Sequence, residues 1–117
     1  MSRGFETILD GITRVQGVRS AVVVSAEDGL VVAESSMEGI DSAALAALTA
    51  SLVSRLGRAM AAAGQLPPAL IHLEGDRGHV LARPAPADLL LVAVAEATAN
   101  VSLLRLTLLD AAERMPS

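Results

Sequence analysis

The stretch of residues 40–63, IDSAALAALTASLVSRLGRAMAAA, constrains the fold most, because it contains no proline and no glycine before Gly57. Ala and Leu dominate it, and both favour helix, since Ala loses no side-chain freedom on folding and Leu loses little. Asp41 can cap the first free amides, and Gly64 with a proline pair shortly after it stops the helix. The chain must therefore build its core around one long helix.

At about 100° per residue, this helix carries two apolar stripes. The first has large side chains and predicts contact with a core; its members are Leu45, Leu48, Leu52, Val53, Leu56 and Met60. The second, called here the small-residue stripe, lies roughly opposite and consists of Ala43, Ala47, Ala50, Ser54, Gly57 and Ala61. Between them runs a narrow polar edge of Ser51, Arg55 and Arg58. Because small residues let two helices approach closely, the second stripe predicts helix pairing; the general abundance of alanine is the alternative explanation.

Composition limits the class of protein. A length of 117 residues is typical of one domain, residues 1–117, for which burying more surface by oligomerising would help. Phe5 is the single aromatic residue and the net charge is −4, so nucleic acid is not an expected partner. The absence of cysteine suits a reducing cytoplasm. The first residues lack a signal-peptide hydrophobic region and no apolar run is long enough for membrane insertion, so we expect a soluble cytoplasmic protein.

The remaining pattern predicts two more helices and five strands. Helical spacing of Phe5, Ile8, Leu9 and Ile12 indicates a first helix, and Asn100 can cap a last one. Strands are predicted at residues 18–25, 30–35, 69–74, 79–83 and 89–95. The order is helix, strand, strand, helix, three strands, helix, which predicts an α+β fold with a largely antiparallel sheet between helices.

Position in the sheet follows from strand composition. The segments AVVV at residues 21–24 and LLLVAVA at residues 89–95 are apolar on both faces, so they should lie centrally under helices on both sides. The more polar strands then form the edges.

With this order in place, the segment GVRSAVVVSAEDGLVVA at residues 17–33, the long small-residue helix and the strand DLLLVAVA resemble the roadblock/LC7 family, particularly its bacterial members. The resemblance implies a five-stranded antiparallel sheet with the long helix on one face and the other two helices opposite. It also implies homodimers that pair through the long helix and the neighbouring edge strand. The small-residue stripe and four edge-strand residues would then form the dimer interface; the four are Leu70, Ile71, His72 and Leu73.

The resemblance further implies a protein that binds partners, including small Ras-like GTPases in bacteria and dynein or membrane-tethered scaffolds in eukaryotes. We expect a homodimeric regulator that binds such a GTPase through Ser51, Arg55, Arg58 and Ala62 and raises its hydrolysis rate. The alternative is a structural adaptor of the dynein light chain roadblock type. A small-molecule sensor ranks last, because the sequence offers few aromatic or convergent polar groups.

We do not expect the chain to catalyse a reaction of its own. A P-loop requires a lysine, and the sequence contains none. His72 and His79 lie on the strands of one predicted hairpin and could approach each other, yet their spacing matches no metal motif, so no metal, cofactor or catalytic residue is predicted. Arg55 and Arg58 could offset phosphoryl charge or position a GTPase's own residues, or they could simply solvate the helix. A binding role is favoured over a catalytic one, because so little else on that face of the helix is polar. A rigid helix is a poor carrier for an inserted arginine, so positioning is favoured. The acidic residues Glu27 and Asp28 are interpreted as solvated turn residues.

Overall fold

The structure is a computed structural model that describes residues 2–115, and the side chains of residues 4–115. Its elements follow the predicted order. They are α1 (Ser2–Thr13), β1 (Val18–Ser25), β2 (Val31–Ser36), α2 (Ser42–Ala62), β3 (Ile71–Gly75), β4 (Gly78–Ala85), β5 (Leu89–Glu96) and α3 (Val101–Glu113). Asp41 caps α2 by accepting from the Ala44 amide at 3.0 Å, and Asn100 caps α3 by accepting from the Leu103 amide at 3.0 Å.

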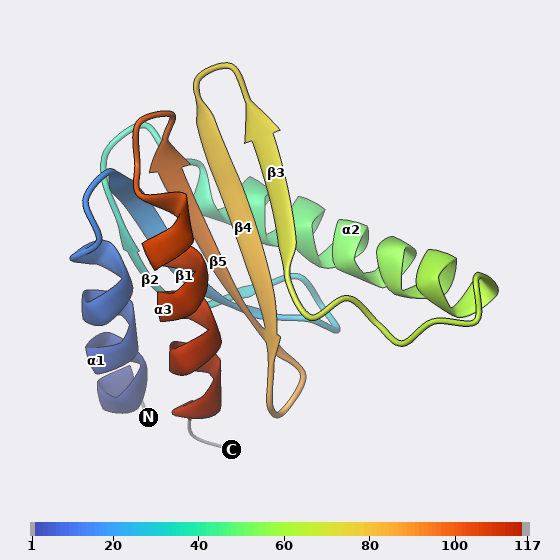
Figure 1. Cartoon of the computed structure of the whole chain (residues 1–117). Coiled ribbons are helices and arrows are strands. Elements are labelled where there is room, and N and C mark those ends of the chain that lie inside the picture. The colour runs from blue at the N-terminus through green and yellow to red at the C-terminus, as the bar shows by residue number, and fades with distance from the viewer. Residues whose placement is uncertain (1, 116–117) are drawn as a thin grey trace.

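The five strands form one antiparallel sheet in the order β2-β1-β5-β4-β3. Helix α2 lies on one face, and α1 and α3 lie side by side on the other (Figure 1). The prediction that the apolar strands lie centrally is confirmed: β5 is in the middle with β1 beside it, and Val22, Val23, Leu91 and Val92 are fully buried. The polar strands β2 and β3 form the two edges.

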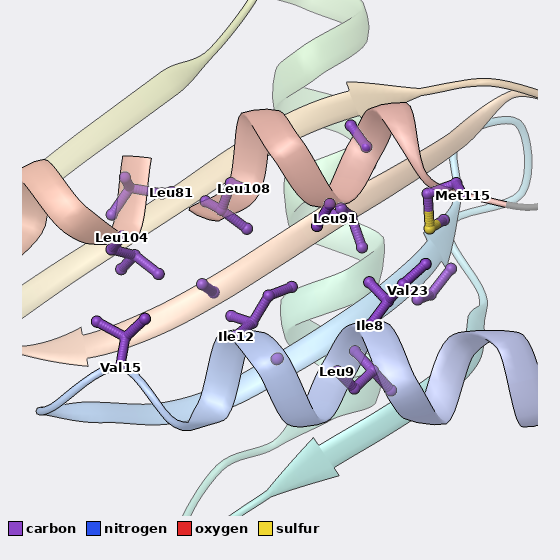
Figure 2. Close-up of a cluster of buried hydrophobic side chains, with 14 of the residues drawn as sticks. Ile8, Leu9, Ile12, Val15, Val23, Leu81, Leu91, Leu104, Leu108 and Met115 are labelled. Atoms are coloured by element: carbon purple, nitrogen blue, oxygen red, sulfur yellow. The ribbon is translucent and has the colours of Figure 1, made fainter. Parts of the chain in front are cut away.

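Large side chains fill the layer between the sheet and the α1/α3 pair. Figure 2 shows Ile8 and Ile12 of α1 pointing toward the side of α3 that carries Leu104 and Leu108, and Leu9 belongs to the same buried cluster. For the first helix, this is the spacing from which the sequence predicts it.

The α2 layer is built differently, and here the predicted core stripe is partly wrong. Leu48 is 71% exposed, whereas Ala46 is fully buried and Ala50 is 6% exposed beneath the helix. The sheet face below already carries bulky Val22, Val24 and Leu90, so small residues are needed where the helix comes closest to the sheet. The true core row is therefore rotated toward the small-residue stripe.

A tight turn between β4 and β5 gives the first testable prediction. Ala87 has φ of +63°, a conformation in which a Cβ costs about 1–2 kcal/mol. Ala87→Gly should therefore raise the free energy of unfolding by about 0.5–1 kcal/mol, after part of the gain is lost to the greater flexibility of glycine in the unfolded chain. Urea denaturation measures the change. Ala85→Gly, two residues earlier in β4, is the control and should destabilise; equal effects at both positions would contradict the strain argument.

Candidate interaction surface

Helix α2 is only partly covered by its own chain. It packs mainly on β1, β2 and β5, and its C-terminal half runs past the edge strand β3 (Figure 1). All four buried residues of α2 lie in the N-terminal half: Ser42, Ala46, Thr49 and Ala50. The C-terminal half of this helix is therefore open to contact from outside.

The predicted partner-binding residues lie together on the solvent side of α2. Ser51, Arg55, Arg58 and Ala62 are all exposed. Within the part of the chain that the structure describes, neither Arg55 nor Arg58 makes a hydrogen bond or an ion pair. Their guanidinium groups are consequently free to pair with acidic or phosphate groups of another molecule.

A cleft of about 420 Å³ adjoins these residues, between α2 and the β1–β2 turn. Its floor is formed where Gly29 approaches the helix: a Cβ added at Gly29, whose φ is +70°, would lie 3.0 Å from the Cα of Ala47. Glu27 and Asp28 form one rim and Arg58 lies on the other. The side chain of Asp28 is held by the Ser25 hydroxyl, which donates to it at 2.8 Å. Both acidic residues are exposed in the turn, as the sequence indicates, and they also line this cleft together with Arg58.

The small-residue stripe divides into two parts. Ala50 belongs to the chain's own core and Ala47 contacts the β1–β2 turn, so the chain itself accounts for these two small side chains. Ser54 and Ala61 are exposed, as is Ala43 near the helix start, and a Cβ added at Gly57 would meet nothing within 4 Å. Nothing in the described residues 2–115 requires a glycine at position 57.

The four edge-strand residues do not share one surface. Ile71 and Leu73 face the α2 side, and Ile71 is only 8% exposed while Leu73 is 47% exposed. His72 faces the α3 side opposite Leu81. Leu70 precedes the strand and packs against the cluster on that same side. The side chain of Leu73 and the outer backbone edge of β3 thus remain open beside the projecting part of α2.

A different hollow, of about 770 Å³, lies on the opposite side of the molecule. It is lined by Gly4, Thr7, Asp10 and Gly11 of α1 and by Arg14 just after that helix, with Ile8 below and Arg114, the C-cap of α3, across it. Arg114 is already paired with Asp110 at 2.8 Å. None of the described residues that line this hollow is aromatic, which gives little support to a sensor that encloses an apolar ligand. Within the described residues 2–115, no helix is long and apolar enough to cross a bilayer.

Comparison with known proteins identifies the fold. No curated protein sequence matches the chain. Among solved structures, Myxococcus xanthus MglB superposes with a TM-score of 0.87 at 20% identity, covering 95% of this chain and 84% of that one. A roadblock/LC7 domain from Streptomyces avermitilis gives 0.81 at 23% identity, covering 92% of this chain and 90% of that one. The gliding protein MglB from Thermus thermophilus gives 0.79 at 23% identity, with 96% and 90% covered.

These similarities show the same arrangement of three helices around a five-stranded antiparallel sheet that the resemblance implied. The family model of the roadblock/LC7 domain matches residues 4–95, which span α1 to nearly the end of β5. The chain therefore belongs to the roadblock/LC7 family.

Proposed function

We propose that this chain is a cytoplasmic homodimeric regulator that binds a small Ras-like GTPase through its paired α2 helices and raises the rate of GTP hydrolysis. One observation carries the proposal: α2 extends beyond its own sheet with a solvent side on which Arg55 and Arg58 are the only charges. An unpartnered surface helix of this length would ordinarily carry many more charged residues. Family membership supplies the expectation of a GTPase partner.

Dimerisation would use the open part of the small-residue stripe together with β3. Ser54, Gly57 and Ala61 would allow close approach of a second α2, and the free edge of β3 would pair with its symmetry mate. Leu73 beside that edge would become buried. A two-fold axis at this edge would place the polar sides of both α2 helices on one continuous surface.

Arg55 and Arg58 would act by docking and positioning. Both sit on a regular helix that cannot extend into a nucleotide pocket as a loop can, so they are suited to hold acidic groups on a GTPase switch segment. Ordering of a switch segment places the GTPase's own water-orienting residue, which accelerates hydrolysis without a residue donated from outside. Ser51 and Ala62 would flank these arginines in the contact.

The direct test combines binding with turnover. The purified protein is mixed with its candidate Ras-like GTPase loaded with GTP, and both complex formation and single-turnover phosphate release are measured. A complex with faster release supports the proposal; neither complex nor acceleration counts against it. A complex without any change in release would instead select the structural adaptor.

Removing both arginines gives the second testable prediction. Arg55→Ala with Arg58→Ala should weaken binding to the GTPase at least tenfold, about 1.4 kcal/mol, because desolvated arginines often dominate interfaces. The free energy of unfolding should change by no more than about 0.5 kcal/mol, since both side chains are exposed and unpaired. Arg105→Ala, exposed on α3 on the other face of the sheet, is the matched control and should bind normally. The control removes one positive charge where the double variant removes two, so a loss of binding free energy about half as large in the control would mean that only total charge matters.

A further inference from the structure

The chain's two histidines meet on the face of the sheet away from α2. His72 is on the edge strand β3 and His79 is on β4, diagonally across the strand pair, because His72 is opposite Leu81 in the register. The Nε2 atom of His72 lies 2.9 Å from the Nδ1 atom of His79. His79 is 7% exposed as a whole residue, whereas His72 is half-buried.

The second nitrogen of His79 fixes how the pair is protonated. Its Nε2 atom lies 3.3 Å from the carbonyl oxygen of Ala97, in the turn after β5. A carbonyl only accepts, so Nε2 carries the hydrogen and donates it. In the neutral ring this leaves Nδ1 as a lone pair directed at His72, whose Nε2–H donates to it.

This is the arrangement in which imidazoles bind metals. A metal-binding histidine usually donates its remaining ring N–H to a backbone carbonyl or carboxylate, which orients the ring and raises the basicity of the other nitrogen. Ala97 provides that acceptor for His79. A cation bound by both rings would replace the hydrogen that they share and would lie to one side of the line that joins the two nitrogens.

We propose that His72 and His79 bind one divalent transition-metal ion, of the class of Zn²⁺, through Nε2 of His72 and Nδ1 of His79. With metal–nitrogen bonds of about 2.0–2.1 Å, a nitrogen separation of 2.9 Å corresponds to an angle of about 90° at the metal. A separation wider by about 0.4 Å gives a tetrahedral angle. His72 supplies this adjustment by rotating on its edge strand and moving its hydrogen to Nδ1.

Water molecules would complete the coordination shell of the metal ion. Within the described residues no third His, Cys, Asp or Glu joins the pair. Glu74 lies directly opposite His79 in the register and its side chain is exposed, so its charge favours a cation nearby. A site with two protein ligands is open and exchangeable, unlike a closed structural zinc site.

Calorimetric titration of the tag-free protein with ZnCl₂ in a chelator-free buffer near neutral pH tests the site. We expect one Zn²⁺ per chain and at least tenfold weaker binding in both His72→Gln and His79→Gln, while MgCl₂ gives no binding because Mg²⁺ prefers oxygen ligands. Glu113→Gln, exposed at the end of α3, controls for nonspecific carboxylate binding and should bind Zn²⁺ as the unmodified chain does.

Nitrogen NMR of the imidazole rings gives an independent readout, in case His79→Gln perturbs folding. Zn²⁺ should shift the Nδ1 resonance of His79 and leave its Nε2–H in place. Absence of heat and of any shift at millimolar Zn²⁺, or unchanged affinity in His72→Gln, would overturn the proposal.

Discussion

Gly17→Ala should destabilise the protein by about 3–4 kcal/mol, a large fraction of the roughly 5–15 kcal/mol that a domain typically has. Gly17 connects α1 to β1 with φ of +90°, a conformation that side chains rarely adopt. A Cβ added there would lie 2.7 Å from the Cβ of Ala99 and 2.9 Å from its Cα. The carbonyl of Gly17 also accepts from the Glu96 amide at 2.8 Å, so the two segments cannot separate without losing that bond.

Two further variants separate the causes of this loss. Gly39→Ala has nearly the same φ, +89°, with nothing within 4 Å of the added Cβ, so it should lose only the conformational part, about 1–2 kcal/mol. Combining Gly17→Ala with Ala99→Gly removes one of the two clashing groups and should recover part of the steric cost. Urea denaturation of these variants beside the unmodified chain measures these terms. A Gly17→Ala loss no greater than that of Gly39→Ala would show that the close approach to Ala99 is unimportant.

The contact between Gly17 and Ala99 shows what sequence reasoning could not reach. The strand positions were predictable because a strand buried on both faces must be apolar at every residue, as Val22, Val23 and Leu91 are. That Gly17 ends one segment was also predictable. The neighbour that makes the glycine necessary lies on a distant turn, and one chain's sequence contains no signal for such a long-range pair.

The lack of long-range information in one sequence also explains why the inward face of α2 was predicted partly wrongly. Two apolar stripes on one helix leave its rotation open, and the larger side chains were assigned to the core. The sheet, however, already provides bulk through Val24, Leu90 and Val92, so the helix fits with Ala46 and Ala50 inward. One sequence signal for the true rotation of the helix was available in Thr49, which belongs to neither predicted stripe. It lies on the inward side with these alanines and is only 7% exposed. The exposure of Arg55 and Arg58 was predictable, since unpaired charges are rarely buried.

Ala61→Glu should convert the proposed dimer into a monomer, halving the particle mass measured by light scattering. Ala61 is exposed on the part of α2 that runs past β3, so the change leaves the chain's own core intact. In a close helix pair the same carboxylate would be buried without a partner, which costs several kcal/mol per subunit. Ala50→Glu would be a poor test, because Ala50 is 6% exposed in the core and its substitution would unfold the chain.

Ala59→Glu is the matched control, since Ala59 is also exposed in the same turn but points away from the small-residue stripe. It should leave the mass unchanged. If Ala59→Glu alone dissociates the dimer, the contact between the two helices must instead lie on the flank of α2 that carries exposed Leu48. If the protein without any substitution is already a monomer, the proposed dimer does not exist. The shared surface proposed for the GTPase then does not exist either. Because both variants change one alanine to glutamate on one turn, the difference between them reports position rather than charge.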